Sequence, residues 1–359
     1  MIVKNESSVI QRCLATVKPW IDSWAISDTG STDGTQEIIK EFMKDIPGEL
    51  IERPWVDFAH NRNEILDLSR KKADYSLFID ADEQFIPHPK LLEFPSSKDC
   101  YFIRINEQTS FHERAFLLKN CCKIFWKGVL HEGLYSNEKY EEGKFELGEI
   151  LSLTQYGNRS RDPMKYLKDA QILEEGLKKD PENSRYMFFL AQSYSNAKEY
   201  DLAIKAYQRR VEMGGREEEV FFSLFMIGAL QEQMGLDSNV YAQSFLKAHQ
   251  LRPFRHEPLY GIAIHYMKNN RFEEAYSLLN QSIQVPYPED SVFVQTHIRD
   301  HLIPYLMIEC CHRLKKYDEC FIIGKKFLSD ASVPENLSEI IKENLSILKT
   351  QIPCLDIKL

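Results

Sequence analysis

The second half of the chain repeats a pattern of small and aromatic residues at a fixed distance along the sequence. The segment Leu190-Ala191-x-x-Tyr194, followed by Ala203, recurs as Ile262-Ala263-x-x-Tyr266, followed by Ala275, so that Ala203 and Ala275 lie 72 residues apart. Small residues let two helices cross closely, and an aromatic side chain fills the space beside the crossing. This half is therefore predicted to be a stack of helical hairpins of about 36 residues each.

The first half follows a different pattern, in which apolar runs alternate with amphipathic segments and turn residues. This order is typical of βα units, and it places polar loops at the carboxyl ends of strands, where open α/β sheets bind ligands. We expect a boundary near residue 160, with a catalytic domain at 1–160 and a helical repeat domain at 161–359. The expected strands are 24–27, 50–53, 75–79, 100–105 and 122–125, and the expected helices are 36–44 and 61–72.

Composition narrows the classes of function. Hydrophobic residues make up 43% and charged residues 28% of the 359, which is typical of a folded globular chain. The net charge of −9 argues against nucleic acid and anionic membrane as partners, and no apolar run is long enough for a transmembrane segment. The eight cysteines include no C-x-x-C pair, so a reducing compartment, the cytoplasm, is expected.

Two acidic loops follow predicted strands. The first is Asp28-Thr29-Gly30-Ser31-Thr32-Asp33-Gly34-Thr35, in which Asp33 or Thr35 is expected to cap the next helix, and the second is Asp80-Ala81-Asp82. Hard cations such as Mg²⁺ or Mn²⁺ prefer carboxylate, water and phosphate oxygens, so such a pair suits a nucleoside diphosphate. An Asp-x-Asp by itself is commonly only a solvated loop.

The order of four motifs is more specific than any one of them. Lys4-Asn5-Glu6, the 28–35 loop, Phe58-Ala59-His60-Asn61-Arg62-Asn63 and Asp80-Ala81-Asp82-Glu83 resemble those of the family 2 glycosyltransferases, over about residues 1–135. The attached repeats resemble tetratricopeptide repeats, as in sublancin-type peptide glycosyltransferases. The resemblance implies an α/β GT-A domain with a Rossmann-like mixed sheet, followed by an all-α tetratricopeptide-like domain. Only Met1-Ile2-Val3 precede the first motif, so either the first strand is short or the sequence starts late within it.

The resemblance also implies roles for individual residues. Asn5 and Glu6 would lie along the uridine, and Asp28 would accept a hydrogen bond from the uracil. Asp80 would lie near the ribose, and Asp82, together with Asp80, would hold the metal. Arg62 would neutralise the diphosphate, with Asn63 supporting it; a plain surface ion pair is the alternative for Arg62.

A further segment, Trp126-Lys127-Gly128-Val129-Leu130-His131-Glu132-Gly133, is similar to the one that closes the catalytic domain in this family. His131 could complete the metal shell or bind a phosphate, and Glu132 could serve as general base, with Glu83 as the runner-up. The alternative is a loop that joins the two domains.

The resulting hypothesis is a metal-dependent inverting glycosyltransferase of the hexosyltransferase type, with Mn²⁺ or Mg²⁺ as cofactor. A UDP-sugar is the expected donor, and the acceptor is a protein, a peptide or a glycan, which the repeat domain could present. The alternative is an inactive glycosyltransferase-like scaffold that uses its repeats for protein–protein interaction. The intact Asp28, Arg62, Asp80 and Asp82 favour the enzyme.

Overall fold

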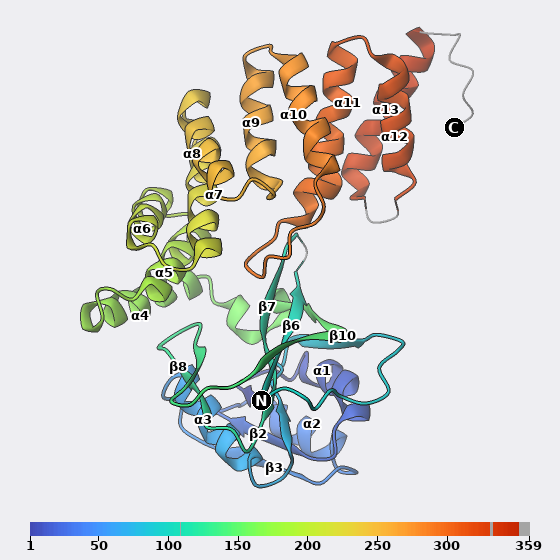
Figure 1. Ribbon diagram of the computed structural model, residues 1–359. Coiled ribbons are helices and arrows are strands. Elements are labelled where there is room, and N and C mark those ends of the chain that lie inside the picture. Colours follow the sequence, from blue (N-terminus) through green and yellow to red (C-terminus); the bar gives the residue numbers. More distant parts are fainter. Residues whose placement is uncertain (108, 331–332, 352–359) are drawn as a thin grey trace. The chain divides into compact units, whose positions relative to one another are not determined.

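The computed structural model describes residues 1–107, 109–330 and 333–351, and the chain divides into two compact units (Figure 1). The first unit is Met1–Ala203 and the second is Ile204–Leu359. Sheets and their covering helices make up most of the first unit, and the second unit is helical in the residues described. The fold class expected from the sequence, a mixed α/β domain followed by helical hairpins, is confirmed.

The first unit is built on a parallel sheet with the strand order β1-β2-β3, formed by β1 (Ile2–Val3), β2 (Trp24–Asp28) and β3 (Gly48–Glu52). A second, five-stranded sheet has the order β4-β7-β6-β10-β5 and is mixed, because β10 pairs parallel with β6 and antiparallel with β5. A hairpin of β8 and β9 completes the described strands. The other bounds are β4 (Tyr75–Leu77), β5 (Glu83–Pro87), β6 (Cys100–Asn106), β7 (Phe111–Lys119), β8 (Ile124–Lys127), β9 (Gly133–Ser136) and β10 (Glu142–Ser152).

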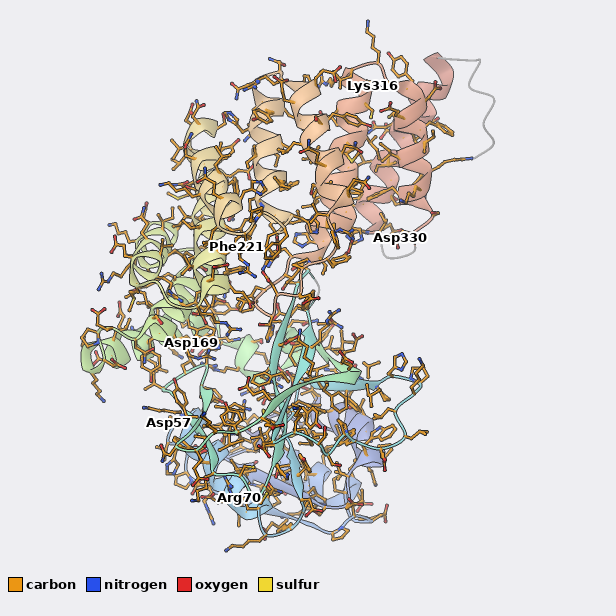
Figure 2. All side chains as sticks on the ribbon, viewed as in Figure 1. Asp57, Arg70, Asp169, Phe221, Lys316 and Asp330 are labelled. Atoms are coloured by element: carbon orange, nitrogen blue, oxygen red, sulfur yellow. The ribbon has the colours of Figure 1, made fainter. Side chains whose placement is uncertain are left out.

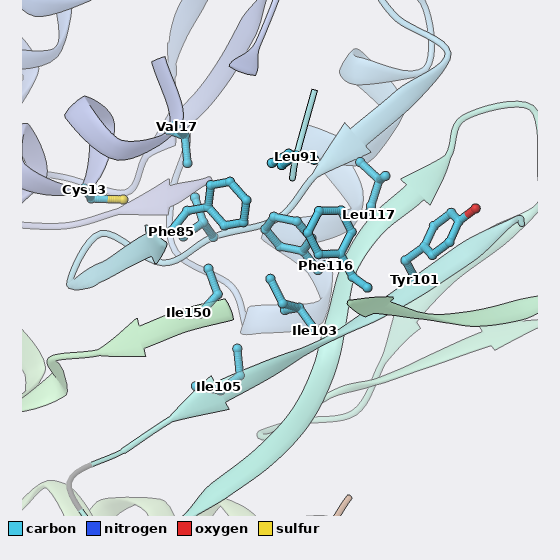
Figure 3. Packing of buried hydrophobic residues seen from close by; sticks show 12 residues of the cluster. Cys13, Val17, Phe85, Leu91, Tyr101, Ile103, Ile105, Phe116, Leu117 and Ile150 are labelled. Atoms are coloured by element: carbon cyan, nitrogen blue, oxygen red, sulfur yellow. The ribbon is translucent and has the colours of Figure 1, made fainter. Parts of the chain in front are cut away.

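Helix α1 (Ile10–Val17) packs against the mixed sheet, next to β5. Its Cys13 and Val17 pack onto a cluster of aromatic and branched side chains from the mixed sheet, among them Phe85 and Phe116, whose ring centroids are 5.4 Å apart (Figure 3). Burying apolar surface at about 25 cal/mol per Å² makes such a cluster the main source of stability for the unit. The cluster fixes α1 against β5, which begins at the end of the Asp-x-Asp loop.

Helix α2 (Thr35–Phe42) begins close to the expected place, but Thr35 is its first residue and does not cap it. The N-cap position is taken by Gly34, whose φ of 90° is one that residues with a side chain rarely adopt. Gly30 also has a positive φ, of 103°. The two glycines therefore allow the loop after β2 to turn sharply twice before the helix starts.

Helix α3 (Phe58–Ser69) begins three residues earlier than the sequence pattern predicted. The carboxylate of Asp57 accepts a hydrogen bond from the backbone N–H of His60 at 2.7 Å, so Asp57 is the N-cap (Figure 2). An N-cap aspartate satisfies one of the free N–H groups of the first turn. Because α3 starts there, Arg62 and Asn63 lie in its second turn.

A helical hairpin follows two short 3₁₀ turns, η2 (Thr154–Tyr156) and η3 (Asn158–Arg161). Helices α4 (Lys165–Lys179) and α5 (Ser184–Asn196) pack against each other and belong to the first unit. Leu173 and Leu190 from this hairpin are buried together with Leu130, from the segment after β8. The first helical hairpin is thus part of the same compact unit as the sheets.

The second unit stacks further helices in hairpins. Gly228 and Gly261 lie so close to the ring of Phe245 that a Cβ on Gly261 would be 2.2 Å from a ring carbon. This agrees with the expected small residues at helix crossings. The helix bounds are α6 (Tyr200–Met213, which crosses from the first unit), α7 (Glu217–Gln233), α8 (Ser238–Leu251), α9 (Glu257–Lys268), α10 (Phe272–Gln284), the π-helical η4 (Ile298–Leu302), α11 (Ile303–Arg313), α12 (Tyr317–Leu328) and α13 (Glu335–Gln351).

In the part of the chain that the structure describes, no helix is both long and apolar enough to span a bilayer.

Candidate active site

The candidate site lies where β1, β2 and β4 end. Strands β1 and β2 are parallel, with Val3 opposite Asp28, so the loops that follow them meet at one edge of the sheet. The third loop, Asp80-Ala81-Asp82, lies between β4 and β5, and the sulfur of Cys13 in α1 is 3.2 Å from the carbonyl of Asp80. The topology therefore brings together three segments that are far apart in the sequence.

Asp28 is fully buried at the end of β2. Its Oδ1 accepts hydrogen bonds from the N–H groups of Gly30 and Ser31, both at 2.8 Å. Burial alone would raise the pKa of Asp28, but the hydrogen bonds from Ser31 and Gly30 hold it below the ordinary value. Its Oδ2 is enclosed and makes no hydrogen bond of good geometry with a described residue, although the Gln36 side chain lies close enough to lower the pKa of the carboxyl group as well.

Asn5 and Asp33 tie the loop after β1 to the loop after β2. The Asn5 side-chain oxygen accepts from Thr32 N at 2.8 Å, and Asp33 accepts from Ser7 N at 3.0 Å and from Thr35 N at 3.1 Å. Asp33 thus links the two loops to the first residue of α2, but it is not the N-cap that the sequence predicted, because Gly34 occupies that position. Thr35, whose expected capping role is wrong, instead accepts from Glu6 N at 2.8 Å.

Glu6 faces the segment that follows β10. Its two carboxylate oxygens lie 3.3 and 3.1 Å from the backbone nitrogen of Asn158, which donates to them. Burial raises the pKa of Glu6 to about 7, because removal from water penalises the charged form. The carboxyl therefore changes charge near neutral pH.

The centre of the site is a line of alternating charges. Arg62 lies between Glu132, at 2.5 Å, and Asp80, at 3.0 Å, and Arg114 lies between Asp80, at 2.9 Å, and Glu83, at 2.6 Å. Burial would raise the pKa of Asp80, but Arg62 and Arg114 lower it to about 2. Asp80 is 35% exposed even though protein surrounds it, so solvent reaches the site from one side. Both arginines are held by carboxylates.

Arg114 was not identified from the sequence. It lies in β7, and its partner Asp80 is 34 residues away along the chain. The available signal was the polar stretch His112-Glu113-Arg114 inside a strand whose other residues are largely apolar. Arg114 also holds Glu83, which is 2% exposed and has a pKa raised chiefly by burial.

Asn63 supports Arg62 through a third residue. Its side-chain amide donates to the carbonyl of Trp126 and accepts from the N–H of Trp126, both at 2.8 Å, which joins α3 to β8. The Trp126 ring lies under the Arg62 guanidinium at 5.3 Å, a cation–π distance. Asn63 thus contacts Trp126, whose ring lies against the Arg62 guanidinium.

Asp82 differs from the other carboxylates of the site because its side chain makes no ion pair or hydrogen bond with another described residue, and only its own backbone N–H acts on it as a donor. Gly157 lies against it, and a Cβ on Gly157 would be 2.3 Å from Asp82 Oδ2. Burial, followed by the charge of Asp80, raises the pKa of Asp82. A carboxylate with free oxygens is available to a cation.

His131 is separate from these acids. Its ring is exposed and stacks on Phe189 of α5 at 4.1 Å, and its carbonyl accepts from Arg185 Nε at 2.9 Å. Across the described residues, no group of three or more His, Cys, Asp and Glu side chains gathers in a way that could hold a metal ion. The 126–133 segment also joins α5 through Val129 N, which donates to the Tyr186 hydroxyl at 3.2 Å, as expected of a connecting loop.

The first unit is similar in sequence to a known class of protein. Residues 1–102 of the chain match the family model for glycosyl transferase family 2. In particular, it is 29% identical over 211 residues to the SPbeta prophage-derived glycosyltransferase SunS of Bacillus subtilis (strain 168), a match that covers 54% of this chain and 47% of SunS. The chain therefore spans about half the length of this relative.

Other similarities concern helical repeats. The chain is 37% identical over 87 residues to a TPR repeat-containing protein of Synechococcus elongatus, covering 24% of this chain and 20% of that protein. Among solved structures, the crystal structure of MamA matches 48% of this chain and 92% of its own, with 14% identity and a TM-score of 0.39.

Proposed function

We propose that this protein is a metal-dependent inverting glycosyltransferase that moves a sugar from a UDP-sugar to a protein, peptide or glycan acceptor. The observation that carries the proposal is the meeting of the loops that follow β1, β2 and β4, where Asp82 keeps a carboxylate without an ion pair next to the Glu132–Arg62–Asp80 ion pairs. A scaffold without catalysis would not need an unpaired, partly buried carboxylate at this place.

The loops after β1 and β2 would bind the nucleoside. Asp28 Oδ2 is a buried acceptor that makes no hydrogen bond of good geometry, and a uracil N–H could satisfy it. Asn5 holds the 28–35 loop, and Glu6 follows Asn5 in the loop after β1. In this proposal Asp80, with its low pKa, stays ionised and accepts from the ribose.

The residues present fit a divalent cation. Family 2 glycosyltransferases generally depend on one, and the chain supplies Asp82 as a free oxygen ligand. Mg²⁺ and Mn²⁺ commonly take only one or two protein carboxylates and complete their shells with phosphate oxygens and water, so a single carboxylate is sufficient. The bound cation would supply charge stabilisation to the departing diphosphate. We propose His131 as a phosphate contact rather than a ligand, since it lies apart from the acids.

The acceptor's proton would pass to Glu132. Only one of its oxygens, Oε1, is paired with Arg62, and Oε2 makes no interaction with a described residue. Glu83 remains the runner-up, but its Oε2 accepts from both Arg114 and Asp80 N and it is buried. Arg62 would hold the base in place and carry positive charge toward the leaving group. The cytoplasmic location and the boundary near residue 160 remain predictions.

The test is release of UDP from a panel of UDP-sugars with Mn²⁺, using the full chain, with Asp82→Ala beside the wild type. We expect release from at least one donor and a loss of at least about a hundredfold in Asp82→Ala, because the cation would lose its protein ligand. An Asp22→Ala variant serves as control, since Asp22 is an acid outside the site. If no donor is hydrolysed and Asp82→Ala binds UDP as the wild type does, the protein is a scaffold.

A further inference from the structure

Lys165 is a cation whose charge interacts with those of Asp169 and Asp82, but its ammonium forms no ion pair with either carboxylate. It is the first residue of α4, and its side chain is half-buried. Its ammonium lies 5.0 Å from the centroid of the Tyr166 ring and makes no ion pair or hydrogen bond with any described residue. A partly buried ammonium without a carboxylate loses hydration and gains little in return.

Most other cations of this region have a partner; Arg161 donates to the Ser8 hydroxyl, and Arg12, which lies over the Tyr156 ring, is the exception. Arg62 and Arg114 are held by the carboxylates described above, and Arg159 forms an ion pair with Asp169 of α4 (Figure 2). Lys168, one turn after Lys165, pairs with Asp162 at 2.6 Å. Arg114 and Lys165 are the two cations that lower the pKa of Asp82, and of these two only Lys165 forms no ion pair.

The chain between β10 and α4 carries Lys165 to the site. Leu153 N donates to the Asp82 carbonyl at 3.3 Å, Gly157 lies against the Asp82 carboxylate, and Asn158 N donates to Glu6. The segment is thus attached to the Asp80-Ala81-Asp82 loop and to the loop after β1 within the eight residues that precede Lys165. Burial, followed by repulsion from Arg159, lowers the pKa of Lys165, as expected of a partly buried cation that forms no ion pair.

We propose that Lys165 binds the diphosphate of the nucleotide-sugar donor, beside the position where Asp82 would hold the cation. This inference rests on the proposed glycosyltransferase function. It assigns the diphosphate contact to a residue from the first helical hairpin, whereas the resemblance assigned it to Arg62. The hairpin would then contribute directly to donor binding.

The test compares the binding of UDP and of uridine to the full chain by calorimetry, in the presence of Mn²⁺, for the wild type, Lys165→Met, Lys165→Arg and Lys168→Met. Methionine keeps the length of the side chain and removes its charge. We expect Lys165→Met to weaken UDP binding about ten- to hundredfold, the usual effect of losing a charge-assisted contact to a phosphate, and to leave uridine binding within about twofold. Lys165→Arg should retain most of the affinity, and Lys168→Met should behave as the wild type.

The outcomes separate the two proposals. If the wild type binds UDP and Lys165→Met binds it as tightly as Lys168→Met does, the assignment of Lys165 is wrong and the glycosyltransferase proposal stands. An equal loss of affinity for UDP and for uridine would also overturn the assignment of Lys165, since it would indicate a structural role for this residue. If the wild type binds no UDP and hydrolyses no donor, the proposed function itself is refuted, and the assignment of Lys165 is refuted with it.

Discussion

Replacing Arg114 by methionine tests whether the line of alternating charges holds the site together. Arg114 donates to Asp80 at 2.9 Å and to Glu83 at 2.6 Å. Methionine fills much of the same volume but cannot pair with either carboxylate. Asp80 would keep Arg62, whereas Glu83 would be left buried with only one backbone donor, from Asp80 N.

The expected cost follows from the exposure of the two carboxylates. A buried carboxylate that loses its partner costs about 3 kcal/mol, and the Asp80 contact adds no more than about 1 kcal/mol because Asp80 is 35% exposed and water screens it. For a unit of this size, 1 kcal/mol corresponds to roughly 2–4 °C, so a cost of about 3–4 kcal/mol should lower the unfolding midpoint by about 6–16 °C. Without Arg114, burial and Asp80 would raise the pKa of Glu83 further. Because a protonated Glu83 needs no cation, the loss should shrink as the pH falls from 7 toward 5.

The assay is differential scanning calorimetry of the full chain, in which UDP with Mn²⁺ identifies the transition of the first unit by raising its midpoint. Lys144→Met is the matched control, since Lys144 forms an exposed ion pair with Glu113 at 3.2 Å on the same sheet, a contact worth less than about 1 kcal/mol. Adding Glu83→Gln to Arg114→Met removes the buried charge and should restore about half of the loss or more. The reasoning is refuted if Arg114→Met lowers the midpoint no more than Lys144→Met, or if Glu83→Gln gives no recovery.

Two further changes test other parts of the molecule. The pKa of Glu6 is about 7, above its ordinary value of 4.5, so its ionised form destabilises the folded state at pH 8, and this penalty disappears toward pH 5. The variant Glu6→Gln keeps an acceptor for Asn158 N. In urea titrations it should be about 1 kcal/mol more stable than the wild type at pH 8 and equally stable at pH 5. Equal midpoints at both pH values would contradict this. In the second unit, Gly261→Ala should cost about 1–3 kcal/mol through its clash with Phe245, although alanine favours helix by about 1 kcal/mol. Phe245→Leu should relieve that cost in the double variant, and a Gly261→Ala protein as stable as the wild type would argue against the close helix crossing.

The elements that the sequence predicted well are those whose signal is local. Strand β2 and the loop after it were expected, because an apolar run followed by Asp and two glycines is readable within about twelve residues. The start of α3 was misplaced because Phe58-Ala59-His60 carries no helical periodicity, and only the Asp57 cap marks it. Local capping competed with the hydrophobic pattern, and the cap determined the boundary.

Contacts over long sequence distances were not readable from one sequence. Nothing near Arg114 indicates that it pairs with Asp80, and nothing near Gly157 indicates Asp82. Gly157 has a φ of −67°, which any residue can adopt, so its backbone gives no reason for glycine. The reason lies 75 residues earlier in the sequence, in the carboxylate that a Cβ would meet at 2.3 Å. Hydrophobic periods predict which face a residue occupies, but they do not predict which residue lies opposite.

The charge of the site explains why a cation would be needed at all. The ionisable side chains in the line of charges and beside it are Asp80, Asp82, Glu83, Glu132, Arg62 and Arg114. Acids exceed bases by two, and both arginines are paired, so a nucleoside diphosphate would meet net repulsion if it approached by itself. A divalent cation at Asp82 cancels the excess, and Lys165 adds one further positive charge beside it. This local balance, rather than the net charge of −9 for the whole chain, is why we expect the nucleotide and the cation to bind together.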